Sequence, residues 1–152
     1  MSATLFIAKM GHLLRGGISA GTHYESERAN YLFIFSEAHN KAVRLEGRAE
    51  YPRILLDDNL KSQLEEMNYT HMDKFFYEDS DGRCCFDIYS VLPVFPNRKD
   101  FLTDINKGIT LNIRHNFNNK KELAKLEYFA KYHNRKVGRE GMNFPHLSIN
   151  II

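Results

Sequence analysis

The chain has 152 residues, of which 43% are hydrophobic and 26% are charged, and its net charge at pH 7 is +2. This length predicts one domain with a real core, and the composition is typical of an ordinary soluble protein. No apolar run approaches the length of a membrane-spanning helix, and the charge is too mild to indicate a polyanionic partner.

The two cysteines, Cys84 and Cys85, are adjacent in the sequence. Adjacent cysteines make a poor disulfide framework and a poor zinc site. Residues 1–7 lack the charged stretch and long apolar core of a signal peptide. We therefore expect a cytoplasmic protein, since a reducing compartment suits both observations.

The first third of the chain predicts both helices and strands. We predict a helix at residues 2–12, a strand at 13–19, a polar loop at 22–30, and a strand or a helix entry at 31–35. Ser36 can cap the next helix, because a serine hydroxyl accepts a hydrogen bond from the first turn. We expect that helix to end near Glu50.

After Pro52, residues 53–56 predict a buried strand, and Asp57 can cap a helix over residues 58–67. Asp81-Gly82 predicts a tight turn between strands at 74–78 and 84–90. The segment from Asp79 begins like a calcium loop but lacks the required glutamate downstream, so we interpret it as a hairpin turn.

The last part of the chain predicts two helices and a tail. The helices are expected at residues 98–116 and 119–136, and the irregular tail carries a candidate strand at 147–152. Residues 119–139 hold seven Lys or Arg against two Glu. Such a segment could contact nucleic acid, but its apolar spacing favours a helix packed on the body with solvated charges. We therefore expect no nucleic-acid partner.

Asn40 and Arg44 are four residues apart, so a helix places them on one face. An asparagine offers both a donor and an acceptor, which suits a sugar, and an arginine offers a planar fork of donors, which suits a phosphate. The simpler interpretation is a solvated polar face, because Lys41, Glu46 and Arg48 are also charged.

Asn40-Lys41-Ala42-Val43-Arg44, preceded by Arg15-Gly16-Gly17, resembles the C-terminal half of a class III adenylate/guanylate cyclase domain. In that family a strand ends in a glycine-containing turn and leads to a helix bearing Asn-x-Ala-x-Arg. The segments Tyr51-Pro52-Arg53-Ile54 and Lys131-Tyr132-His133-Asn134 look closest to stand-alone bacterial cyclases of the antiphage pyrimidine type. The resemblance spans residues 5–135.

The resemblance implies an α/β (α+β) fold, the ferredoxin-like cyclase sheet with helices on one face. It implies a partial cyclase domain over residues 1–136 and a C-terminal tail over 137–152. It also implies the formation of a 3′,5′-cyclic nucleotide from a nucleoside triphosphate, with release of pyrophosphate, for intracellular signalling. Arg44 would stabilise the charge that builds at the α-phosphate, and Asn40 would hold the ribose.

The family's two metal-binding aspartates lie upstream of the Arg-Gly-Gly strand. Fourteen residues precede Arg15 here, and none is Asp or Glu. The N-terminal metal-binding strands are therefore expected to be missing, and the ligands of Mg²⁺ or Mn²⁺ would have to come from a partner chain. That partner would be a complete cyclase domain, because a homodimer of this chain alone would lack metal ligands and is not expected to catalyse. Two alternatives stay open: an inactive cyclase-like binding or regulatory module, and a basic interaction protein.

Three more residues are substrate-binding candidates by resemblance. Phe33 matches the base-reading position, where the family usually has Asp, and it is either a stacking residue or simply core. Arg15 could lie near phosphates, although Gly16 and Gly17 also predict a bulge or a close helix–strand approach. Arg83, just after the hairpin turn, could reach a triphosphate. Unpaired sheet edges also predict self-association.

Overall fold

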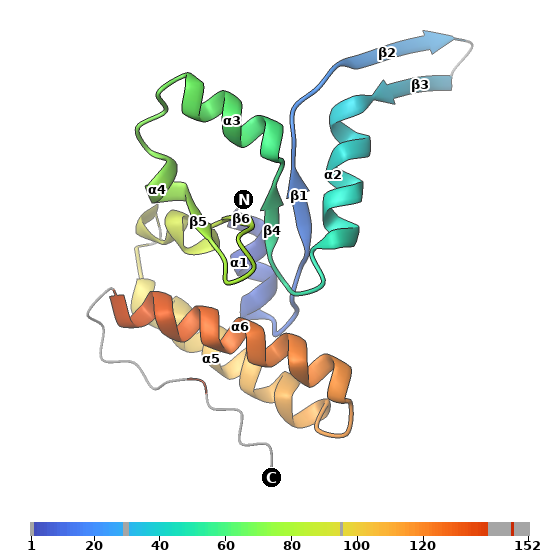
Figure 1. Ribbon diagram of the computed structural model, residues 1–152. Helices are drawn as coiled ribbons and strands as arrows, with labels where there is room; N and C mark the ends of the chain where they lie inside the picture. Colours follow the sequence, from blue (N-terminus) through green and yellow to red (C-terminus); the bar gives the residue numbers. More distant parts are fainter. Residues whose placement is uncertain (1, 29–30, 95, 140–146, 148–152) are drawn as a thin grey trace. The chain divides into compact units, whose positions relative to one another are not determined.

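The computed structural model describes residues 2–28, 31–94, 96–139 and 147 (Figure 1). The chain divides into two compact units. The central unit is Arg15–Asp87, and the terminal unit combines Met1–Leu14 with Ile88–Ile152. Helices and a mixed sheet are both present, so the predicted α+β class is confirmed. The cyclase sheet stays a prediction.

The central unit is built on a four-stranded mixed sheet with the order β1-β4-β6-β5. Its strands are β1 (Gly16–Ile18), β4 (Ile54–Leu56), β5 (Phe76–Glu78) and β6 (Cys84–Phe86). β1 and β4 run parallel, whereas β6 is antiparallel to both of its neighbours. Each strand lies within a predicted segment, although each is shorter than predicted.

Helix α2 (Glu37–Arg48) packs on β1 at Gly17. A Cβ at Gly17 would lie 2.5 Å from the Ala42 carbonyl oxygen and 2.6 Å from the Leu45 Cβ. Any larger residue at this position would push the helix off the strand, so the predicted close helix–strand approach is confirmed at Gly17. The small core beneath it consists of Ala49, Leu55 and Cys85, with Leu45 and Tyr77 packed against them.

Strands β2 (His23–Arg28) and β3 (Tyr31–Ser36) form a separate antiparallel hairpin. The prediction of a polar loop at 22–30 is therefore wrong for residues 23–28, and residues 29–30 lie outside the described residues. That prediction relied on the polar composition of the segment, because alternating polar and apolar residues reveal a strand only where one of its faces is buried. Nearly every described side chain of this hairpin is exposed, so the alternation is missing.

The turn and cap predictions for the rest of the central unit are confirmed. The Asp57 side chain accepts a hydrogen bond from Leu60 N at 3.3 Å and caps α3 (Asp58–Glu66). A short helix, α4 (Met72–Phe75), follows. Gly82 has a φ of +77° in the turn between β5 and β6, which is the conformation that favours glycine.

The terminal unit consists of α1 (Ser2–Lys9), the 3₁₀ helix η1 (Ile88–Val94), α5 (Arg98–His115) and α6 (Lys120–Arg139). The first helix stops three residues before the predicted His12, and Gly11 follows it with a φ of +85°. The segment 88–90, predicted as strand, belongs to η1 instead. No helix in the described part of the chain is long and apolar enough to cross a membrane.

The predicted apolar face of α6 is confirmed. Its buried members are Leu123, Leu126, Phe129, Ala130, His133 and Val137. The helix runs through the expected boundary at 136/137 and ends at Arg139, so residues 137–139 are helical rather than irregular. Of the candidate strand 147–152, only Leu147 is described. Its backbone N–H and carbonyl are both paired with the Asn134 amide at 2.9 Å.

Candidate functional site

Helix α2 presents Asn40 and Arg44, and its start is well defined. The Ser36 hydroxyl accepts a hydrogen bond from His39 N at 3.1 Å, as the sequence predicts. Glu37 lies in the first turn and Arg48 in the last, so both charges complement the helix dipole.

The inner face of α2 is attached to the β1 segment at two points. The Ser19 hydroxyl donates a 2.5 Å hydrogen bond to the Ala38 carbonyl, and Gly17 contacts the helix at Ala42. At 3.6 residues per turn, Asn40 and Arg44 lie on the side of the helix opposite Ala42. Both are exposed, so a rigid element presents them outward, away from β1.

The charged residues around this pair are engaged in ion pairs. Lys41 Nζ lies 2.8 Å from Glu37 Oε1, and Arg15 lies 2.7 Å from Glu46. The hydrogen bond from Lys41, followed by one from the Thr22 backbone, lowers the pKa of the Glu37 carboxyl. By contrast, Asn40 and Arg44 make no hydrogen bond or ion pair with any residue that the structure describes. Their polar atoms are available to a ligand.

The five candidate residues do not form one cluster. Arg15 is paired with Glu46 near the C-terminal end of α2, and Arg83 donates a 2.5 Å hydrogen bond to the Arg48 carbonyl at that same end. Arg48 lies four positions after Arg44 along the helix, a rise of about 6 Å. Only Asn40 and Arg44 share a face.

Phe33 lies on the β2–β3 hairpin, paired in register with Ser26, and 57% of it is exposed. The interpretation of Phe33 as a core residue is therefore wrong. Nothing in the described structure tests a stacking role for its ring.

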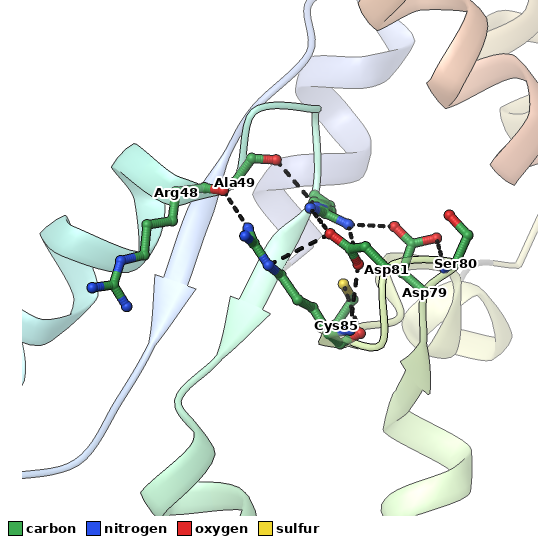
Figure 2. Close-up of polar contacts among 8 residues, drawn as sticks. Arg48, Ala49, Asp79, Ser80, Asp81 and Cys85 are labelled. Carbon is green, nitrogen blue, oxygen red and sulfur yellow. Dashed lines mark hydrogen bonds and ion pairs between the residues drawn. The ribbon is translucent and has the colours of Figure 1, made fainter.

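The turn between β5 and β6 holds a cluster that the sequence did not predict (Figure 2). Arg53 donates to Asp79 Oδ2 at 2.6 Å, to Asp81 Oδ2 at 2.6 Å and to the Ala49 carbonyl at 3.1 Å. Only 3% of the Arg53 side chain and 7% of the Asp79 side chain are exposed. The hydrogen bond from Arg53 holds the pKa of Asp81 below its usual value. The cluster joins the turn to the end of α2.

These carboxylates do not fit a divalent metal. Asp79 and Asp81 accept hydrogen bonds from Arg53, and Asp57 caps α3. Across residues 2–28, 31–94, 96–139 and 147, no group of three or more His, Cys, Asp or Glu side chains could hold a metal ion.

Comparisons with protein-family models, with curated proteins and with solved structures find no match to this chain. A functional assignment therefore depends on the residues and geometry of α2 and on the resemblance of its motif to the cyclases.

Proposed function

We propose that this chain is a nucleotide cyclase-like domain. It binds a nucleoside triphosphate through Asn40 and Arg44 and takes part in forming a 3′,5′-cyclic nucleotide for intracellular signalling. The observation that carries this proposal is the exposed pair itself. Its two side chains lie one turn apart on the outer face of a capped, anchored helix, and no described residue neutralises Arg44.

The chemistry assigns each residue a role. The ribose 3′-hydroxyl oxygen bonds to the α-phosphorus, the bond from that phosphorus to the bridging oxygen breaks, and pyrophosphate leaves with the electron pair. The hydroxyl proton passes to solvent. Arg44 donates hydrogen bonds to the α-phosphate oxygens, where negative charge builds in the transition state. Asn40 binds the ribose and holds its hydroxyl in line with the leaving group.

An outward-facing pair forms only one wall of a site, so a second surface must complete it. We propose that a partner domain supplies that surface and the carboxylates for Mg²⁺ or Mn²⁺, which would neutralise the phosphates. That partner is a complete cyclase domain, because a second copy of this chain has no metal-binding cluster among its described residues. If no metal-bearing partner exists, the same two residues make the chain an inactive nucleotide-binding module.

The proposal is tested by measuring turnover and nucleotide binding of the wild-type chain and of matched variants. The purified chain is incubated with ATP, GTP, CTP or UTP and Mn²⁺, and cyclic product is measured by mass spectrometry. Any turnover, by the chain alone or after a complete cyclase domain is added, is expected to fall by about 10²–10³-fold in Arg44→Ala, because the substitution removes a donor to the developing charge. Arg48→Ala is the control, since it removes an exposed cation from the same helix outside the pair.

A chain without turnover is tested for binding of a fluorescent nucleoside triphosphate. Binding that Asn40→Ala and Arg44→Ala weaken and Arg48→Ala preserves supports the inactive module. Wild-type protein that neither turns over nor binds any of the four nucleotides contradicts the proposal and favours a basic interaction protein.

A further inference from the structure

Strand β3 carries the longest run of exposed large apolar side chains among the described residues. They are Tyr31, Leu32, Phe33, Ile34 and Phe35, each 57–69% exposed. At about 200 Å² for a large side chain, five such residues expose roughly 600 Å². These side chains point alternately to the two faces of the hairpin, and exposed apolar surface of this extent often marks an interaction site. In Figure 1 the hairpin extends beyond β1 and α2, so neither element of the central unit covers it.

The hydrogen-bond register shows which backbone groups of β3 are unpaired. Glu37 N donates to Thr22 O at 2.9 Å, one step beyond the register pair His23↔Ser36. Hydrogen-bonded pairs alternate in an antiparallel ladder, so the next ones are Tyr24/Phe35 and Ser26/Phe33. Phe33 and Phe35 therefore direct their backbone groups toward β2.

The residues between them, Leu32 and Ile34, direct their backbone N–H and carbonyl groups away from β2. Among the described strands, β2 is the only one that pairs with β3. The outer edge of β3 is therefore an open ladder edge.

The two edges of the hairpin differ in charge. At the other edge, strand β2 exposes Glu25 and Glu27, and the His23 side chain is paired with Glu25 at 2.7 Å. Charged side chains on an edge strand disfavour the addition of another strand. The six residues of β3 carry no charge, so only the β3 edge is suited to strand pairing.

We propose that β3 pairs with β3 of a second copy of this chain, antiparallel, with the two-fold axis at Phe33. In this register Leu32 of one copy lies opposite Ile34 of the other, and the two such pairs exchange four backbone hydrogen bonds. Phe33 of one copy lies opposite Phe33 of the other in a non-hydrogen-bonded pair, where side chains approach most closely.

The strand is its own complement in this register. Tyr31 lies opposite Phe35, so aromatic residues meet aromatic residues on one face and aliphatic residues meet on the other. An isologous pairing of this kind closes at two copies, which fits one more copy of the chain better than an unrelated strand. Edge pairing satisfies the open backbone groups of Leu32 and Ile34 and buries the facing flanks of the side chains on both faces of the sheet. A lone hairpin is marginally stable, and the paired sheet has four strands. The inference does not rest on nucleotide binding.

The register is tested with single cysteine substitutions and a mild oxidant. Phe33→Cys places two sulfurs opposite each other across the axis and is expected to form a covalent dimer. Leu32→Cys and Ile34→Cys are matched controls on the same strand, and each would lie opposite a different residue. Cys84 and Cys85 are buried, so little background reaction is expected. Equal cross-linking of the three variants, or none in Phe33→Cys, overturns the proposal.

A second measurement uses no oxidant. Wild-type protein is expected to dimerise in light scattering coupled to gel filtration, and a strictly monomeric wild type overturns the proposal. Phe33→Glu would set two carboxylates opposite each other and weaken dimerisation by at least about tenfold. Phe117→Glu changes a residue that is 65% exposed outside the hairpin and should leave the dimer intact. Circular dichroism checks that both variants fold.

Discussion

The guanidinium of Arg53 donates a 2.6 Å hydrogen bond to the carboxylate of Asp79, which lies 26 residues further along the chain. Both side chains are almost inaccessible to solvent. Burying a charge is costly unless it is paired and hydrogen-bonded, so each partner depends on the other. Because Arg53 also donates to the Ala49 carbonyl, the pair connects the β5–β6 turn to the end of α2, the helix that carries Asn40 and Arg44.

Replacing Arg53 with methionine is expected to destabilise the protein strongly. The substitution leaves the Asp79 carboxylate buried without its cation, which typically costs about 3–5 kcal/mol of unfolding free energy. Arg83→Met is the control, because the Arg83 side chain is 44% exposed and its ion pair should contribute less than about 1 kcal/mol. Urea denaturation followed by circular dichroism measures both. Equal losses in the two variants would contradict a buried structural pair.

The same cluster predicts a dependence of stability on pH. The hydrogen bond from Arg53 lowers the pKa of Asp81 below its ordinary value of 3.8. A carboxyl whose folded pKa is lowered contributes stability that is complete above the unfolded pKa and is lost as the pH falls toward the folded value. Urea midpoints measured between about pH 6 and pH 3 should therefore fall for wild type below about pH 4. Asp81→Asn should show a shallower fall, and a parallel one would refute the assignment.

Two glycines of the central unit are expected to respond oppositely to alanine. Gly17→Ala would place a Cβ 2.5 Å from the Ala42 carbonyl oxygen and should cost about 1–3 kcal/mol through overpacking. Gly47, inside α2, has no atom within 4 Å of such a Cβ, so Gly47→Ala should stabilise the helix by about 0.5–1 kcal/mol. Thermal unfolding of the two variants distinguishes them. A neutral Gly17→Ala would show that the helix can shift without cost.

The features that the sequence predicted correctly depend on residues close together in the chain. Ser36 and Asp57 cap helices through a backbone N–H three residues ahead, and Asp81-Gly82 forms its turn within four residues. The buried face of α6 follows from helical spacing alone. Local chemistry sets each of these features, so no knowledge of the fold is needed to predict them.

The features that were missed depend on distant partners. The sequence predicts a buried strand that begins at Arg53, and nothing near this residue in the sequence indicates Asp79 as its partner. The apolar run around Phe33 indicates burial in the core, and only the resemblance suggests base stacking, yet its strand pairs only with the polar β2 in the described structure. For Asn40 and Arg44, the sequence predicted one helix face. It could not show that the face points away from the sheet.

The buried thiols provide a test of how well the core of the central unit excludes solvent. Burial raises the pKa of Cys85 from 9.0 to about 12, and it also raises the pKa of Cys84. The thiolate is the reactive form, so iodoacetamide at pH 8 should alkylate Cys85 about a thousandfold more slowly than an ordinary thiol. A thiol with a raised folded pKa contributes stability that is complete below about pH 9 and is lost as the pH rises toward 12. Mass spectrometry of timed samples measures the alkylation, with the exposed thiol of a Phe117→Cys variant as the internal reference. Protection should vanish in urea, and native Cys85 reacting as fast as that reference would show that this core opens readily.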